Sequence, residues 1–220
     1  MIRLAIFDFD GTLGDTLELI LKCNHETRHR MGAKEIPDQA IIACIGIPLR
    51  GGIAQMNPGM DMADMPKWVE TYLQVFQEFE KHITPGLFPG VKDTITKLYE
   101  AGITLTVASS RETDSLNNFL RKMGLAPYFK YVLGAEDVTK AKPDPEPVLK
   151  TQKDLGFRPE ETLVVGDMPV DIRMGRGAGA KTCGVTFGNS TPEALTAAGA
   201  DYIIDSFSQL TEIVIDRQQG

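Results

Sequence analysis

Residues 8–16 read Asp-Phe-Asp-Gly-Thr-Leu-Gly-Asp-Thr and directly follow an apolar run, residues 2–7. A short apolar run bounded by turn-forming residues predicts a buried strand. Asp8 and Asp10 stand two apart at its end, and alternate residues of a strand share one face. Two carboxylates that close repel each other unless a cation lies between them or one is protonated. The stretch therefore indicates a site for a hard divalent cation such as Mg²⁺.

Composition narrows the class of protein. Of the 220 residues, 42% are hydrophobic and 24% are charged, which is typical of a soluble globular chain with a real core. The net charge is −7 without a block of Lys or Arg, which argues against nucleic acid or a membrane surface as partner. No apolar run approaches the ~18 residues of a membrane helix, and no signal-peptide pattern follows Met1. Because Cys23, Cys44 and Cys183 are an odd, scattered set, we expect reduced thiols and a cytoplasmic location.

The hydrophobic pattern divides the chain into two kinds of segment. Residues 15–85 are predicted to be all-helical, with helices at 17–31, 38–44 and 64–81. Residues 51–65 are predicted to be loop and short turns, because this stretch is rich in Met, Gly and Pro and lacks a period. From residue 90 onward, helical segments alternate with predicted strands at 103–108, 131–133, 162–165, 182–186 and 202–204. This alternation predicts an α/β fold with a doubly wound, parallel, Rossmann-like sheet, formed by residues 1–14 and 86–220 around a helical insert.

Polar residues gather at the ends of the predicted strands, where ligands bind in such sheets. Ser109, Ser110 and Arg111 follow the strand at 103–108, Lys142 lies beside two prolines, and Asp167 and Asp171 follow the strand at 162–165. Each has a simpler explanation taken alone, as a helix cap or as a solvated lysine. Since all of them fall at one edge of one sheet, together they favour a shared site.

These residues resemble the motifs of the haloacid dehalogenase-like superfamily of aspartate-nucleophile phosphatases. The matching segments are Asp8-x-Asp10-Gly11-Thr12-Leu13, Ser109, Lys142-Pro143-x-Pro145 and Gly166-Asp167-x-x-x-Asp171. The resemblance covers nearly the whole chain and is strongest to the phosphoglycolate phosphatases. It implies that residues 15–85 form a helical cap of the family's first type.

The resemblance also implies roles for the acidic residues. Asp8 is expected to be the nucleophile that forms an aspartyl-phosphate. Asp10 is expected to protonate the leaving group and then to activate water. The implied metal is Mg²⁺, held by Asp8, the backbone carbonyl of Asp10 and Asp167.

The remaining motif residues are implied to serve the phosphoryl group. Ser109, with the backbone N–H groups around Asp10, Gly11 and Ser110, is expected to hold phosphoryl oxygens. Lys142 is expected to offset the developing negative charge. Asp171 is expected to orient water or Lys142.

The substrate is expected to be a small phosphorylated metabolite, with phosphoglycolate as the first choice and pyrophosphate or a sugar phosphate left open. Arg50 follows a cap loop, residues 46–49, and is expected to contact an anionic part of the substrate. A sugar-phosphate mutase is a further alternative. Mutases of the superfamily carry a His five residues beyond the last Asp of the opening motif, and here that place, counted from Asp15, is Ile20.

A rival motif of a different class is His25-Glu26-Thr27-Arg28-His29, which matches the zinc metalloprotease pattern H-E-x-x-H. The longer form of that pattern has a third His where this chain has Glu35. Arg28 and Arg30 would also repel a zinc ion. We therefore interpret the segment as the polar face of a helix.

Overall fold

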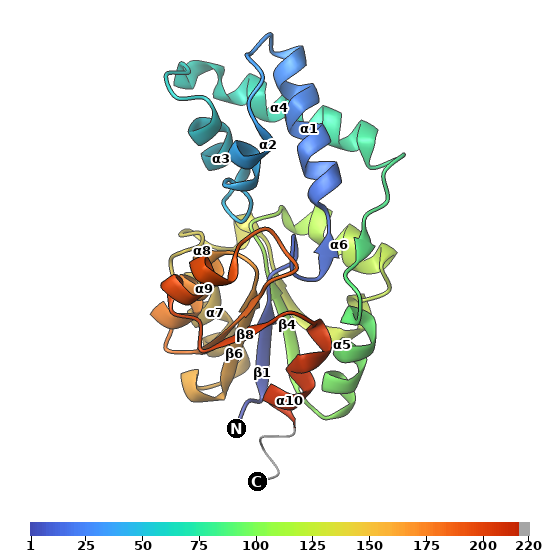
Figure 1. Ribbon diagram of the computed structural model, residues 1–220, viewed down its shortest axis with the longest axis vertical. Helices are drawn as coiled ribbons and strands as arrows, with labels where there is room; N and C mark the ends of the chain where they lie inside the picture. The colour runs from blue at the N-terminus through green and yellow to red at the C-terminus, as the bar shows by residue number, and fades with distance from the viewer. Residues whose placement is uncertain (216–220) are drawn as a thin grey trace.

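The computed structural model describes residues 1–215 and is built on a six-stranded parallel sheet (Figure 1). The strand order is β5-β4-β1-β6-β7-β8. The strand bounds are β1 Leu4–Phe7, β4 Thr104–Ala108, β5 Phe129–Leu133, β6 Thr162–Gly166, β7 Lys181–Val185 and β8 Tyr202–Ile204. The predicted α/β class with a parallel sheet is confirmed; residues 216–220, the end of the predicted core, lie outside the described residues.

Helices cover both faces of the sheet, and the two faces follow the alternation of side chains along β1. Ala5 and Phe7 belong to the larger hydrophobic cluster, together with side chains of α5, α6 and α10. Leu4 and Ile6 belong to a second cluster with α7 and α8. The bounds of the flanking helices are α5 Val91–Glu100, α6 Thr113–Lys122, α7 Glu146–Leu155, α8 Pro169–Gly177, α9 Pro192–Ala198 and α10 Leu210–Val214. Because both faces of β1 are buried, its sequence is apolar throughout.

The strand order places a topological switch point at β1. The chain runs outward from β1 through β4 to β5 and then returns to β6, on the other side of β1. Crevices at such switch points lie beyond the carboxyl ends of the strands. Asp8, the first residue after β1, therefore lies directly at the expected ligand site.

The helical insert stands over this carboxyl end of the sheet (Figure 1). It contains α1 Leu17–Arg30, α2 Asp38–Ile42, α3 Leu49–Met56 and α4 Met65–Phe79. The chain enters and leaves it through an antiparallel pair, β2 Gly14–Asp15 and β3 Gly86–Leu87. No described helix is both long and apolar enough to cross a membrane.

The prediction of loop and short turns over residues 51–65 was wrong for residues 51–56, which lie in a helix, and was correct for the short turn near residue 63. Helix α3 covers Leu49–Met56, and a 3₁₀ turn covers Met62–Asp64. Gly51 and Gly52 lower the helix propensity of this segment. Burial of Ile53 against Met65 and Trp68 in the insert's own small core compensates, so tertiary packing overrides the local preference.

Candidate active site

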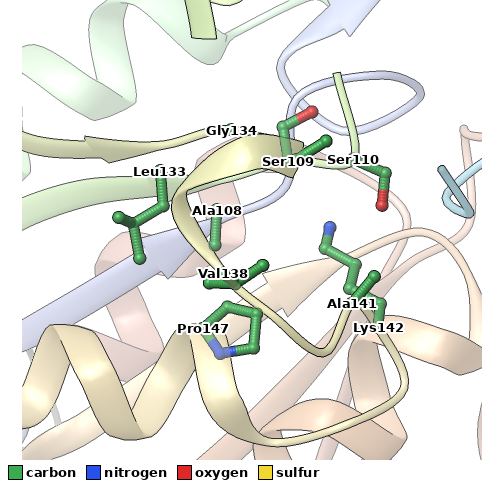
Figure 2. A pocket seen from close by; sticks show the side chains of 10 residues that line it. Ala108, Ser109, Ser110, Leu133, Gly134, Val138, Ala141, Lys142 and Pro147 are labelled. Atoms are coloured by element: carbon green, nitrogen blue, oxygen red, sulfur yellow. The ribbon is translucent and has the colours of Figure 1, made fainter. Parts of the chain in front are cut away.

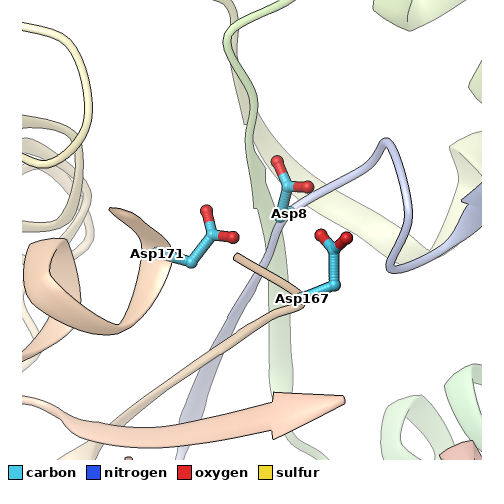
Figure 3. Close-up of side chains that lie close together, drawn as sticks. All are labelled: Asp8, Asp167 and Asp171. Atoms are coloured by element: carbon cyan, nitrogen blue, oxygen red, sulfur yellow. The ribbon is translucent and has the colours of Figure 1, made fainter. Parts of the chain in front are cut away.

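Three buried carboxylates converge at the carboxyl end of the sheet (Figure 3). Asp8 follows β1, Asp167 follows β6, and Asp171 lies in the first turn of α8. One oxygen from each lies within 4.8 Å of the others. Parallel strands end at the same edge, so residues far apart in the chain meet here.

Lys142 connects two of these carboxylates. Its buried Nζ donates to Asp8 Oδ1 at 2.5 Å and to Asp171 Oδ1 at 2.7 Å. The other oxygen of Asp171 accepts the backbone N–H of Met168 at 3.0 Å and caps α8. Asp171 thus joins the start of α8 to Lys142 and holds the ammonium group against Asp8.

The electrostatics of the cluster favour a bound cation. Burial raises the pKa of Asp8 well above its ordinary value, and the ammonium of Lys142 opposes that rise. Burial, followed by the charge of Asp171, raises the pKa of Asp167 to about 7. Burial alone would lower the pKa of Lys142, but the carboxylates of Asp171 and Asp8 more than offset this and raise it.

The donor set also suits such a cation. Three carboxylates face one ammonium group, which leaves an excess of negative charge in a buried site. A hard divalent cation with oxygen ligands, such as Mg²⁺, fits both this charge and these donor atoms.

We had expected Asp8 and Asp10 to share one face of a strand. Neither residue lies in the strand, because β1 ends at Phe7. Its carboxylate is paired with Arg111 instead, with Nη2 to Oδ1 at 2.6 Å and Nε to Oδ2 at 3.2 Å. The hydroxyl of Thr16 donates to Oδ1 at 2.7 Å. The cation that balances Asp10 is therefore the guanidinium of Arg111. In the sequence, this residue was notable only because it follows a predicted strand.

Ser109 and Ser110 follow β4 beside Lys142 (Figure 2). The Oγ of Ser109 accepts the backbone N–H of Arg111 at 3.2 Å. The Oγ of Ser110 donates to the carbonyl of Gly46, in the loop between α2 and α3, at 2.7 Å. The cavity that these serines line holds about 10 Å³, room for one water molecule, so it is not itself a substrate pocket.

Asp167 is held by two residues that carried no predicted role in the site. Thr12 Oγ1 donates to Oδ1 at 3.2 Å. Asn189 donates twice to Oδ2, from its backbone N at 2.8 Å and from Nδ2 at 2.9 Å. In the sequence, Asn189 stood out only as the first residue of an Asn-Ser-Thr triplet.

The sequence as a whole matches the family model described as haloacid dehalogenase-like hydrolase over residues 5–185. The chain belongs to this family. The match includes Lys142 and the three buried carboxylates, from Asp8 to Asp171, whereas Asn189 lies just beyond it. The chain is thus a hydrolase, as the motif resemblance indicated.

Named relatives of this haloacid dehalogenase-like hydrolase match it over almost their full length. Pyrophosphatase PpaX of Anoxybacillus flavithermus is 32% identical over 213 residues, 97% of this chain and 97% of that protein. The Dickeya dadantii protein named "Probable phosphatase IndB" is 37% identical over 210 residues, 94% of this chain and 91% of that protein. The crystal structure of a haloacid dehalogenase-like hydrolase from Bacteroides fragilis has a TM-score of 0.89 at 31% identity, covering 96% of this chain and all of that one.

The rival zinc motif is not assembled in the hydrolase. His25 Nδ1 lies 3.0 Å from Glu35 Oε2, and its Nε2 lies 2.7 Å from Asp38 Oδ1, so both ring nitrogens already face carboxylates. These contacts raise the pKa of His25, with the hydrogen bond to Asp38 as the largest cause. His29 is largely exposed and lies 4.0 Å from Glu26. His25, Glu26 and His29 lie on the partly exposed side of α1, whereas Thr27 and Arg28 are buried, so the interpretation as a polar helix face holds for the first three.

Two residues that were predicted to bind substrate, Gly11 and Arg50, lie in different parts of the structure. Gly11 lies in the turn after β1, against Asp167 and Asn189. Arg50 is exposed in the first turn of α3, on the insert. Its expected contact with substrate stays a prediction.

Proposed function

We propose that this protein is a Mg²⁺-dependent phosphatase that acts on a small phosphorylated metabolite through an aspartyl-phosphate. The observation that carries the proposal is the hydrogen bond from Lys142 to Asp8 inside a buried group of carboxylates at the switch point of the sheet. A buried carboxylate beside an ammonium group and a cation site is equipped to attack a phosphate dianion that would otherwise repel it.

The first half-reaction follows from the two aspartates. An oxygen of Asp8 attacks phosphorus while the bond between phosphorus and the leaving oxygen breaks. Asp10 would first take up a proton and turn away from Arg111; it then gives this proton to the leaving oxygen, so the product leaves as an alcohol or as a protonated phosphate. Asp10 then takes a proton from water, whose oxygen attacks phosphorus and releases inorganic phosphate and Asp8.

Other residues would bind rather than react. Asp8, Asp167 and the backbone carbonyl of Asp10 would hold Mg²⁺, which supplies charge neutralisation between the phosphoryl group and the nucleophile. Ser109 and the backbone N–H groups around Gly11 and Ser110 would hold phosphoryl oxygens.

Lys142, oriented by Asp171, would complete this set of cationic and hydrogen-bonding groups. Its short contact with Asp8 supports a role in offsetting the negative charge that develops during the attack.

The helical insert would act as a cap, with residues 15–85 moving relative to residues 1–14 and 86–220 about the β2–β3 pair. Arg50 on α3 would then meet an anionic part of the substrate. Three free, buried cysteines support the proposed cytoplasmic location.

Two substrates are favoured. Phosphoglycolate is the choice suggested by the motif resemblance. Pyrophosphate is the second candidate, because a relative that is 32% identical over 97% of this chain is named pyrophosphatase PpaX. Both present a second anionic group next to the phosphoryl group, which is what Arg50 would recognise.

The proposal is tested by the variant Asp8→Asn. We expect turnover of phosphoglycolate and of pyrophosphate to fall by at least about 10⁴-fold because the nucleophile is lost, while the circular dichroism spectrum stays unchanged. Free phosphate is measured with and without Mg²⁺ for both substrates and for an aryl phosphate. Turnover at the wild-type rate by folded Asp8→Asn would contradict the mechanism. Turnover by the wild type that is equally fast in excess chelator would also contradict it.

A further inference from the structure

The loop between β7 and α9 reaches back across the sheet edge to Asp167. Asn189, in this loop, donates two hydrogen bonds to the same oxygen, Asp167 Oδ2. A carboxylate can only accept, so the amide of Asn189 must turn its NH₂ group toward Asp167. The orientation of this side chain is therefore set by its partner.

The two carboxylate oxygens of Asp167 differ in the number of hydrogen bonds that they accept. Oδ2 accepts from both donors of Asn189, which occupy its two lone-pair directions. Among residues 1–215, the one donor to Oδ1 is the hydroxyl of Thr12, at 3.2 Å. One lone pair of Oδ1 thus stays free, on a side chain whose rotation is restrained from both sides.

The approach of this loop is very close. A Cβ on Gly188 would lie 2.3 Å from the carbonyl oxygen of Gly11 and 2.4 Å from the Cβ of Asp167. A Cβ on Gly11, where φ is +86°, would lie 2.2 Å from Asn189 Nδ2. Only glycine fits at either place. The ring centre of Phe187 lies 4.9 Å from that of Phe88, so aromatic packing also holds this loop.

We propose that Asn189 is a positioning residue for the divalent cation. By occupying Oδ2, it presents Oδ1 of Asp167 as the single ligand atom that this side chain offers. The inference rests on the proposed function only in taking Mg²⁺ as the cation. Partners that orient a metal-binding side chain typically contribute about 10–100-fold to metal affinity.

The test is a direct measurement of Mg²⁺ binding by isothermal titration calorimetry on the full-length protein. Asn189→Ala removes the side-chain donor and keeps the backbone one, so we expect the Kd for Mg²⁺ to rise by about tenfold. Because the residue only positions a ligand, activity at saturating Mg²⁺ should be largely recovered. Ser190→Ala, a truncation at the next residue of the same loop, is the matched control and should keep the wild-type Kd.

Two further proteins make the outcome decisive. Asn189→Leu keeps the volume of the side chain without its donors, and it replaces the Ala variant if that one loses its native circular dichroism spectrum. Asp167→Asn should lose Mg²⁺ binding altogether. A Kd within twofold of wild type in a folded Asn189 variant would overturn this inference and leave the proposed function standing. A wild-type protein that binds no Mg²⁺ would overturn both.

Discussion

At the scale of single residues, the protonation of Asp167 is the property that a stability measurement tests most directly. It is fully buried beside Asp171, and its pKa is raised to about 7 from an unfolded value near 3.8. The folded protein without metal therefore keeps a proton on Asp167 over a range in which the unfolded chain has lost it. The contribution of protonated Asp167 to the free energy of unfolding is complete below about pH 4 and is lost as the pH rises through about 7.

Asp167→Asn should therefore stabilise the metal-free protein at alkaline pH. The amide oxygen can accept both donors of Asn189, and its NH₂ group can donate to the hydroxyl of Thr12, so the hydrogen bonds survive. A shift of about three pKa units corresponds to at most about 4 kcal/mol. We expect the Tm in EDTA at pH 8 to exceed that of wild type by about 4 °C or more.

The control for this prediction is the same comparison at pH 5, where Asp167 is protonated in the folded wild type. Only the interval between the unfolded pKa near 3.8 and pH 5 then contributes, so the difference in Tm should be less than half of that at pH 8. A difference in Tm that is equal at pH 5 and pH 8 would show that ionisation of Asp167 is not its cause.

At the scale of elements, Arg111 joins three segments that are distant in the sequence. It follows β4 and pairs with Asp10 after β1, and its guanidinium carbon lies 5.2 Å from the ring centre of Phe76 on α4 and 4.9 Å from that of Phe119 on α6. The planar guanidinium supports both the bidentate pair and the contacts with the ring faces. The position of the insert and the orientation of Asp10 are thus linked through one side chain.

Arg111→Met should leave Asp10 as a largely buried, unpaired carboxylate and lower the free energy of unfolding by about 2 kcal/mol or more. The measurement is a double-mutant cycle by urea denaturation with Asp10→Asn and the double variant. If the pair is coupled as the geometry indicates, the double variant will be more stable than the sum of the single effects by at least about 1 kcal/mol. Additive effects would rule out the coupling.

At the scale of the whole molecule, one hydrogen bond joins the helical insert to the loop that follows β4. Ser110 Oγ donates to the carbonyl of Gly46 at 2.7 Å, and Gly46 lies against Val170 on α8. The loop between α2 and α3 is thus docked on the sheet edge that carries the candidate site.

Ser110→Ala should loosen this docking without unfolding the protein. A hydrogen bond of this kind contributes about 1 kcal/mol, so backbone amides of residues 45–47 should exchange with solvent roughly fivefold faster. Hydrogen exchange followed by mass spectrometry measures this, with Ser190→Ala as a variant that should not alter the same loop. Unchanged exchange at residues 45–47 would show that the contact does not hold the insert in place.

The sequence by itself determined the strands, their alternation with helices, and the meeting of Asp8, Lys142, Asp167 and Asp171. These predictions depend on periodicity and on one geometrical rule, that parallel strands end at the same edge of a sheet. Lys142 is the exception, because it lies in the loop between β5 and α7 and was placed by the motif resemblance rather than by this rule.

The tertiary structure alone decided how the charges of the site are paired. Asp10 and Arg111 are 101 positions apart, and Asp167 and Asn189 are 22 apart, so no local pattern joins either pair. Helix α3 likewise forms because Ile53 finds a buried place, despite its two glycines. Pairings of this kind depend on loop paths and on close approaches between backbones, and these follow from the packing of the whole chain rather than from the period of any segment.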